Sequence, residues 1–345
     1  MKTINNTTRI ILGITILCLA VFASCSKSGS DDPTPPTEKQ FDVYVAGGVI
    51  GGSKTARYWK NGEPTDFAGT KNYPYSIYVS GTDVYLAGAG TDNALGYAKM
   101  WQNGKQTHLS DGTYSATATG ITVSGGNVYV SGYDRPAGKS MVATLWKNKT
   151  AIPLTTGVNS ASAEDVFVVG NDVYVAGQEN KTGKYVAKIW KNNSVLFDLT
   201  NGSNNANAIS VFVSGTDVYT AGYEYSGTKQ VAKLWVNKTA TSLSDGNNNA
   251  QAKSVFVSGS DVYVAGYEDN GVNKTAKLWK NNVASDLPGG ETANAVFVIN
   301  NDVYVAGTGS NAEGTGARLW KNGTPVTLKD SKDYTATSVF VVERE

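Results

Sequence analysis

The residues of this chain best suited to chemistry are tyrosines and carboxylates in four similar short segments. Each segment follows a close variant of Asp-Val-Tyr-Val-Ala-Gly, and the four are Tyr133-Asp134, Gln178-Glu179, Tyr223-Glu224-Tyr225 and Tyr267-Glu268. A tyrosine offers a flat apolar face and a hydroxyl, and a carboxylate beside it accepts hydrogen bonds from hydroxyl groups. Such a set suits stacking on sugar rings or anchoring a protein partner.

A second group of tyrosines precedes copies of a Ser-Val-Phe-Val-type segment, namely Tyr73, Tyr75, Tyr114 and Tyr334. The corresponding stretches at 204–207 and 247–251 are small and rich in Asn and Ala. If these stretches are loops at consecutive seams of a ring, the four tyrosines should cluster in one sector. The candidate ligand-binding residues are therefore Tyr73, Tyr75, Tyr114, Tyr334, Tyr133, Glu179, Tyr223, Glu224, Tyr267 and Glu268. The alternative is that several of these tyrosines only cover the neighbouring repeat.

Catalysis has less support in the sequence. If Asp134, Glu179, Glu224 and Glu268 faced one another, they could act as a carboxylate-dependent glycoside hydrolase or polysaccharide lyase. They recur at similar positions, however, as structural or solvated residues would. The chain has no nucleophile elbow, no phosphate loop and a single histidine, His108, which we expect to face solvent. No catalytic residue is predicted.

Composition excludes several other kinds of site. The two cysteines, Cys18 and Cys25, lie near the N-terminus, so sites built from Cys and His are unavailable to the rest of the chain. The Asp that opens each repeat stands alone, and no metal or cofactor is expected. Loss of Lys2 and Arg9 with a signal peptide leaves 28 basic residues against 29 acidic ones. This balance shows no footprint for nucleic acid.

The candidate residues stand on an internal repeat. The Asp-Val-Tyr-Val-Ala-Gly segment at Asp42 returns six times at spacings of 41 to 45 residues, and one tryptophan follows each copy. One unit, 254–287, reads SVFVSG-SDVYVAG, a variable loop, TAKLWKN and VASDL. Its four short pieces are rich in β-branched and aromatic residues and end at turn residues, which indicates four strands.

The repeat predicts an all-β fold, a seven-bladed β-propeller of four-stranded antiparallel blades. Both faces of a strand such as 261–265 are apolar, as expected for a sheet between two others. The chain begins with a DVYVAG strand at Phe41 and ends with an SVFV-type strand at 338–342. We therefore expect the C-terminal strand to pair with the N-terminal blade and close the ring.

Three sets of repeated aromatics are expected to pack blade against blade. The sets are the DVY tyrosines (44, 85, 129, 174, 219, 263, 304), the tryptophans (59, 101, 146, 190, 235, 279, 320) and Tyr78, Phe167, Phe212, Phe256, Phe297 and Phe340, with Thr122 breaking the third pattern. A basic residue stands two places before most tryptophans, which suggests an outer, partly exposed strand. The Asp of each DVY segment is expected to accept turn N–H groups.

The N-terminus has the features of an export signal. Lys2 and Arg9 precede an apolar run from Ile10 to Ala23, and the run ends at Phe-Ala-Ser-Cys25. This resembles a bacterial lipoprotein box with Cys25 as the lipidated residue, although Phe22 replaces the commoner leucine. The expected organisation is a lipoprotein signal peptide at 1–24, the lipidated Cys25 and a flexible tether at 25–40, and the propeller at 41–345.

The DVYVAG and LWKNG repeats across 41–345 resemble those of uncharacterised Bacteroidetes surface lipoproteins, and in period and strand order they resemble kelch-type and WD-type propellers. The acidic pair after Cys25 resembles the surface-export signal of such lipoproteins, which implies an address on the outer membrane. We expect a monomeric, non-catalytic, lipid-anchored protein that binds a glycan or protein partner on its loop face. A scaffold subunit of an outer-membrane complex is a further alternative.

Overall fold

The computed structural model describes residues 39–50, 55–70, 72–92, 95–311 and 314–344. The predicted signal peptide, the lipidation site at Cys25 and most of the predicted tether lie outside these residues. From Lys39 onward the chain is one compact unit. None of the described residues belongs to a helix of the length and apolarity needed to cross a membrane.

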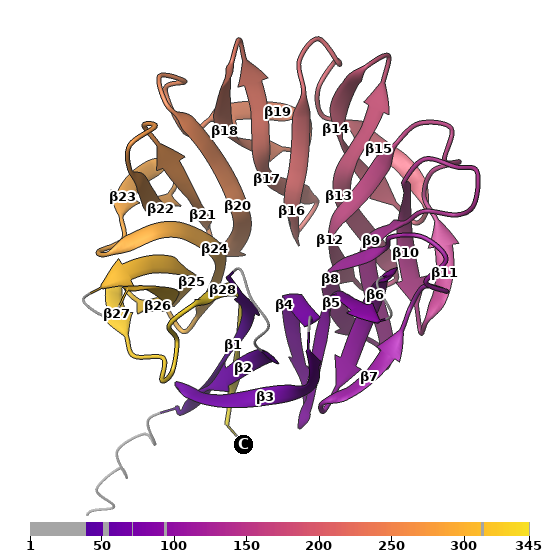
Figure 1. The fold of residues 1–345 in the computed structure, drawn as a ribbon. Helices are drawn as coiled ribbons and strands as arrows, with labels where there is room; N and C mark the ends of the chain where they lie inside the picture. The colour runs from indigo at the N-terminus through magenta and orange to yellow at the C-terminus, as the bar shows by residue number, and fades with distance from the viewer. Residues whose placement is uncertain (1–38, 51–54, 71, 93–94, 312–313, 345) are drawn as a thin grey trace, which may run out of the picture. The chain divides into compact units, whose positions relative to one another are not determined.

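Seven four-stranded antiparallel sheets are arranged as blades around a central axis (Figure 1). We number the blades along the chain, so that blade 1 contains β1 and blade 7 contains β27. The predicted seven-bladed propeller is confirmed.

The innermost strand of each blade lines the axis. These strands are β28 (Tyr334–Glu343) in blade 1, then β4 (Asn72–Ser80), β8 (Thr117–Ser124), β12 (Ala161–Val169), β16 (Ala206–Ser214), β20 (Asn249–Ser258) and β24 (Gly290–Ile299). The second strands carry the DVYVAG segments. They are β1 (Phe41–Val49), β5 (Asp83–Asp92), β9 (Asn127–Asp134), β13 (Asp172–Lys181), β17 (Asp217–Ser226), β21 (Asp261–Asp269) and β25 (Asp302–Asn311).

The third strands carry the tryptophans. They are β2 (Thr55–Lys60), β6 (Leu95–Gln102), β10 (Val142–Lys147), β14 (Lys184–Lys191), β18 (Lys229–Val236), β22 (Lys274–Lys280) and β26 (Gly314–Lys321). The outermost strands are mostly shorter. They are β3 (Glu63–Thr70), β7 (Lys105–His108), β11 (Thr150–Pro153), β15 (Ser194–Asp198), β19 (Thr239–Ser242), β23 (Val283–Asp286) and β27 (Thr324–Val326).

Blade 1 is completed by the end of the chain. Strand β28 pairs antiparallel with β1, with Phe41 opposite Glu343 and Tyr44 opposite Phe340. The Arg344 N–H donates to the Gln40 carbonyl at 2.8 Å, which extends the pairing beyond both strands. The predicted closure by the C-terminal strand is confirmed, and Figure 1 shows β28 beside β1 on the axis side.

The repeated aromatics hold neighbouring blades together, as predicted. In the first seam, Tyr44 of blade 1 and Trp101 of blade 2 share one buried cluster. In the next, Tyr85 of blade 2 meets Trp146 of blade 3. The same pairing recurs around the ring, so each tryptophan faces the preceding blade and each DVY tyrosine faces the following one.

The predicted partial exposure of the tryptophans is wrong. All seven are 0–1% exposed, because they lie on the third strand and are covered by the preceding blade. Two of the basic residues before them, Lys99 and Lys188, are also buried. The basic residues that share this strand face with the tryptophans therefore did not show that the face is exposed to solvent.

The Asp of the DVY segment has a different partner from the one predicted. In six blades it accepts a hydrogen bond from the side-chain amide of an asparagine at the turn after the third strand, as in Asp261 with Asn281 at 2.8 Å. The same asparagine accepts from the next backbone N–H, here that of Val262 at 2.9 Å. This clamp ties the two turns of each blade on one face of the ring. Its asparagines hold positive φ near 50°, which suits a tight turn.

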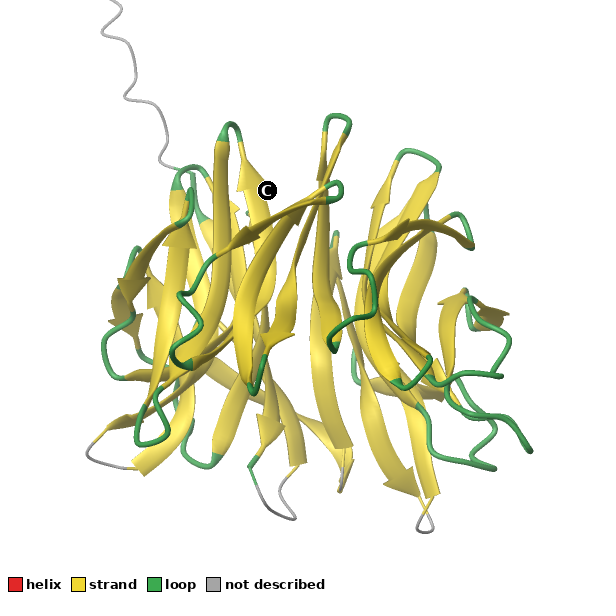
Figure 2. Ribbon diagram, turned by 90° about the horizontal axis from the view of Figure 1, so that it is seen from above, coloured by secondary structure: helices red, strands yellow, loops and turns green. Residues whose placement is uncertain are grey.

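The ring has two distinct faces. Lys39, the β1–β28 end and the Asp–Asn clamps lie on one face, since Phe41 is opposite Glu343. The inner strands begin on the other face, beside the ends of the second strands, as in Asn72 opposite Gly90. Figure 2 shows the strands running between these two faces.

Candidate functional site

Every inner strand contains a bulge at the same place. The register with the second strand skips one residue, as between Ala163 and Asp165 in blade 4. The skipped residues are Thr337, Tyr75, Thr119, Glu164, Ile209, Lys253 and Asn294 from blades 1 to 7. A bulge frees one residue from the ladder and re-aims its side chain.

The repeat sequence is built for this bulge. A buried alanine precedes the skipped residue in six blades, and a glycine ends the DVYVAG segment opposite it. A Cβ on Gly222 would lie 2.0 Å from the Asn207 carbonyl oxygen. The glycine therefore allows the bulged strand to approach the second strand closely.

The seven bulge residues surround one cavity of about 590 Å³ on the axis. Ser76, Asp165, Ser210, Ser254 and Ser338, which follow them in the chain, also line it, together with Tyr73 and Tyr133. Cavities of this size, formed by a few convergent polar groups and aromatic faces, are typical of small-molecule sites. Seven mostly different side chains thus meet at one place on a repetitive scaffold.

Farther along the inner strands, the third aromatic set forms a partial collar around the axis. Neighbouring rings are 4.5–5.0 Å apart from Phe167 round to Tyr78. The collar is interrupted at Thr122 in blade 3, as the sequence indicated. None of these rings lines the cavity, which therefore lies toward the face where the inner strands begin.

Asp165 is a buried carboxylate, and burial disfavours its charged form. Its two oxygens accept from the backbone N–H groups of Val166 (2.8 Å) and, across the blade seam, Val211 (3.0 Å). Serines take the equivalent place in the next two blades. The Ser210 hydroxyl accepts from the Val255 N–H of the following blade, and the Ser254 hydroxyl accepts from the Val296 N–H. Burial nevertheless raises the pKa of Asp165 to about 6, and the nearby Glu164 adds to the shift.

We expect Asp165→Ser to stabilise the protein near neutral pH. The native state binds the Asp165 proton more tightly than the unfolded state, so its ionisation lowers stability as pH rises from about 4 to about 6. Serine keeps the bond to Val211 without the charge. Relative to wild type, the variant should gain about 2 kcal/mol between pH 4 and pH 7, measured by urea unfolding at both values. An equal difference at both pH values would contradict this account.

Three of the predicted tyrosines are in the cavity. Tyr73 and Tyr75 belong to β4, and not to a loop as predicted; their ring centroids are 4.8 Å apart. Burial raises the pKa of Tyr73 to about 12. Tyr133, on β9, receives a hydrogen bond from the Thr117 hydroxyl at 3.1 Å. Blades 2 and 3 therefore supply one aromatic side of the cavity.

Tyr223 and Tyr267 lie close to the cavity but do not line it. They are half-buried on β17 and β21, opposite Asn207 and Gln251 of the inner strands. Burial raises the pKa of Tyr223 to about 12, and the charge of Glu164 contributes. These two tyrosines flank the site on the side of blades 5 and 6.

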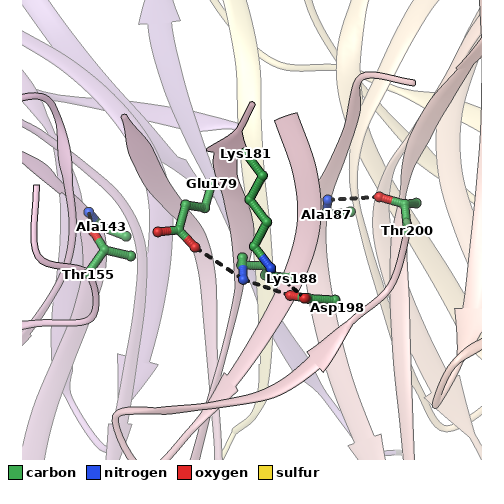
Figure 3. Close-up of polar contacts among 8 residues, drawn as sticks. All are labelled: Ala143, Thr155, Glu179, Lys181, Ala187, Lys188, Asp198 and Thr200. Carbon is green, nitrogen blue, oxygen red and sulfur yellow. Dashed lines mark hydrogen bonds and ion pairs between the residues drawn. The ribbon is translucent and has the colours of Figure 1, made fainter. Parts of the chain in front are cut away.

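Three of the four predicted carboxylates, Glu179, Glu224 and Glu268, do not face one another. Glu179, Glu224 and Glu268 each lie near a lysine of their own third strand, at 3.1 Å from Lys188, 3.8 Å from Lys233 and 3.2 Å from Lys277. Figure 3 shows Lys188 between Glu179 and Asp198, which also contacts Lys181. Recurrence of a carboxylate therefore reflected a recurring ion pair within the blade. None of the three lines the cavity.

The predicted sector of four tyrosines does not form. Tyr334 is only 3% exposed, since it packs edge-on against Trp59 and under the Arg57 guanidinium. It belongs to the seam between blades 7 and 1. Tyr114 is 40% exposed but lines a separate pocket with Arg135 and Lys139.

The sequence reasoning missed Glu164, Asp165 and Lys253, the charged residues of the cavity. The sequence feature that could have identified them is the position x in the repeated pattern Ala-x-Ser-Val-Phe-Val. This position holds a different residue in nearly every copy, including Glu164 and Lys253. His108 is exposed and stacks on Tyr97, away from the cavity. Within the described ranges, no group of three or more Asp, Glu, His or Cys residues is placed to hold a metal ion.

No protein-family model matches the chain, and no curated protein matches its sequence. Among solved structures, it is similar to a puromycin-hydrolyzing peptidase of Mycobacterium tuberculosis, with a TM-score of 0.55 and 9% identity. That match covers 83% of this chain and 53% of the peptidase, so the chain spans about half of that protein's length.

A second similar structure is the β-propeller domain of the Trilobed protease from Pyrococcus furiosus. The TM-score is 0.50 and the identity 10%, over 85% of this chain and 95% of that domain. That domain is described as having an open velcro topology, whereas β28 closes the ring here. At these identities, both similarities establish the propeller fold alone.

Proposed function

We propose that this protein is a lipid-anchored, non-catalytic binding protein of the cell surface that takes a carbohydrate in its axial cavity. The observation that carries the proposal is the ring of bulge residues, because mostly different side chains from all seven blades converge there on one cavity. Tyr73, Tyr75 and Tyr133 offer ring faces for a sugar, and the serines, threonines and charged groups offer hydrogen bonds.

The cavity favours a small hydroxylated ligand over a protein surface. It is a concave space on the axis, lined by residues from all seven inner strands, and many of these residues are polar. The resemblance of the N-terminus to a lipoprotein signal supports the address.

The contacts of the carboxylates favour binding over hydrolysis. Glu179, Glu224 and Glu268 are held near lysines, and both Asp165 oxygens are occupied by backbone N–H groups. A glycosidase needs two carboxyl groups on opposite sides of a bond. Incubation of the protein with bound polysaccharide should therefore release no oligosaccharide; release that is lost in Glu164→Gln would favour the hydrolase alternative.

Substitution of Tyr75 by alanine should weaken carbohydrate binding about tenfold, because it removes one aromatic face from the cavity. The measurement is a glycan array followed by titration of the strongest glycan. Tyr114→Ala is the matched control, since both tyrosines are 40% exposed and Tyr114 lines a different pocket. Unchanged affinity in Tyr75→Ala would show that the cavity is not the site, and absence of any glycan ligand would refute the proposed function.

A further inference from the structure

Lys253 differs from the other charged residues of the cavity, Glu164 and Asp165, which both accept hydrogen bonds. It is the bulge residue of blade 6, on β20, and its side chain is half-buried on the cavity wall. Among the described residues, its ammonium has no hydrogen-bond acceptor and no carboxylate within 4 Å. Its ammonium lies 5.9 Å from the centroid of the Tyr267 ring.

The charges around Lys253 are of both signs. The negative charge of Glu164 acts on it favourably from blade 4, and the positive charge of Lys274 acts unfavourably. Lys274 lies over the same Tyr267 ring at 4.9 Å. Burial lowers the pKa of Lys253, because the ammonium is less well hydrated on the cavity wall than in water. An anion beside it would compensate this loss of hydration.

The acidic groups of the cavity, in contrast, already have donors. The Glu164 carboxylate accepts from the Ser162 hydroxyl at 2.7 Å and weakly from the Asn207 amide at 3.5 Å. Asp165 is held by Val166 and Val211. The strongest remaining requirement within the cavity is therefore for negative charge at Lys253.

We infer that the ligand is an acidic sugar whose carboxylate binds Lys253. Glu164, Ile209 and Lys253 are the bulge residues of consecutive blades 4, 5 and 6, so an aliphatic surface separates the two charged ones. A uronic acid ring matches this order, with a carboxylate at one edge, an apolar ring face and hydroxyls at the opposite edge. The hydroxyls donate to Glu164. This inference rests on the proposed carbohydrate function and specifies its ligand.

The test compares acidic sugars with their neutral counterparts. Oligomers of galacturonate and glucuronate, and the same oligomers after reduction of their carboxyl groups, are titrated into the purified protein by calorimetry. Wild type should bind at least one acidic oligomer about tenfold more tightly than its reduced counterpart, as expected for one desolvated ion pair. Lys253→Met should abolish that preference, and Lys105→Met on β7, outside the cavity, should retain it.

The outcomes separate this inference from the function beneath it. Equal affinity of wild type for acidic and reduced oligomers, or a preference that survives in Lys253→Met, overturns the role of Lys253 and leaves carbohydrate binding intact. Binding of neutral glycans but of no acidic oligomer would likewise overturn the role of Lys253 and leave carbohydrate binding intact. If none of the acidic oligomers and no other glycan binds, the inference and the proposed function both fail. Thermal unfolding of each variant establishes that it is folded.

Discussion

Truncation of the chain after Asp330 is expected to yield aggregated or largely unfolded protein. The cut removes β28, and with it the buried Tyr334, Val339 and Val341 of the seam between blades 7 and 1. Burial of each such side chain contributes about 1.5–3 kcal/mol, against a total stability of about 5–15 kcal/mol for a typical domain. The cut also leaves β1 with an open edge that can pair with other chains. Size-exclusion chromatography and thermal unfolding measure both effects.

A circular permutant provides the matched control. Joining residue 345 to residue 39 by a short Gly/Ser linker, and opening the chain after Asp330, keeps every strand. Because the Arg344 N–H already donates to the Gln40 carbonyl, the linker turns β28 and β1 into the hairpin found in the other blades. We expect the permutant to unfold near the wild-type temperature. A truncated chain that did so as well would show that closure by β28 is dispensable.

The repeat made the architecture predictable from the sequence. Seven DVYVAG copies and a spare final strand determine the number of blades and the closing pair, because unpaired strand edges must find partners. Packing of repeated aromatics across the seams followed from the same argument. The burial of the tryptophans, in contrast, could not be predicted from the repeat. The tryptophans share a strand face with basic residues, but the neighbouring blade buries all seven tryptophans together with Lys99 and Lys188, which strand periodicity does not reveal.

The candidate site was only partly predictable. Tyr73, Tyr75 and Tyr133 were identified because they break the pattern, and they are in the cavity. The charged residues were missed because a bulge shifts the phase by one residue, which alternation alone assigns to the wrong face. Tyr334 also breaks the pattern, but its partner Arg57 lies on β2 of the same blade, near the other end of the sequence. Comparison of the repeats cannot predict the contacts that form where the C-terminal strand meets the N-terminal strands.

Gly222→Ala is expected to cause a second large loss of stability. The variant tests whether the glycine opposite the bulge holds the bulge residue in its place on the cavity wall. The new Cβ would lie 2.0 Å from the Asn207 carbonyl oxygen and 3.1 Å from a Trp235 ring atom. Neither neighbour can move easily, since one is ladder backbone and the other is fully buried. We expect a loss of about 3 kcal/mol in the free energy of unfolding, measured in urea.

Gly96→Ala is the matched control, because its nearest contact is the Ser115 hydroxyl at 3.3 Å and the glycine does not hold positive φ. It should cost less than about 1 kcal/mol. Gly222 lies outside the cavity wall, so any loss of ligand affinity in folded Gly222→Ala protein must come from displacement of the bulge at Ile209. If both variants lost equal stability, the close approach at the bulge would not be what requires glycine. The expected result would show that the recurring glycine of the repeat sets the geometry of the bulge, and through it that of the axial cavity.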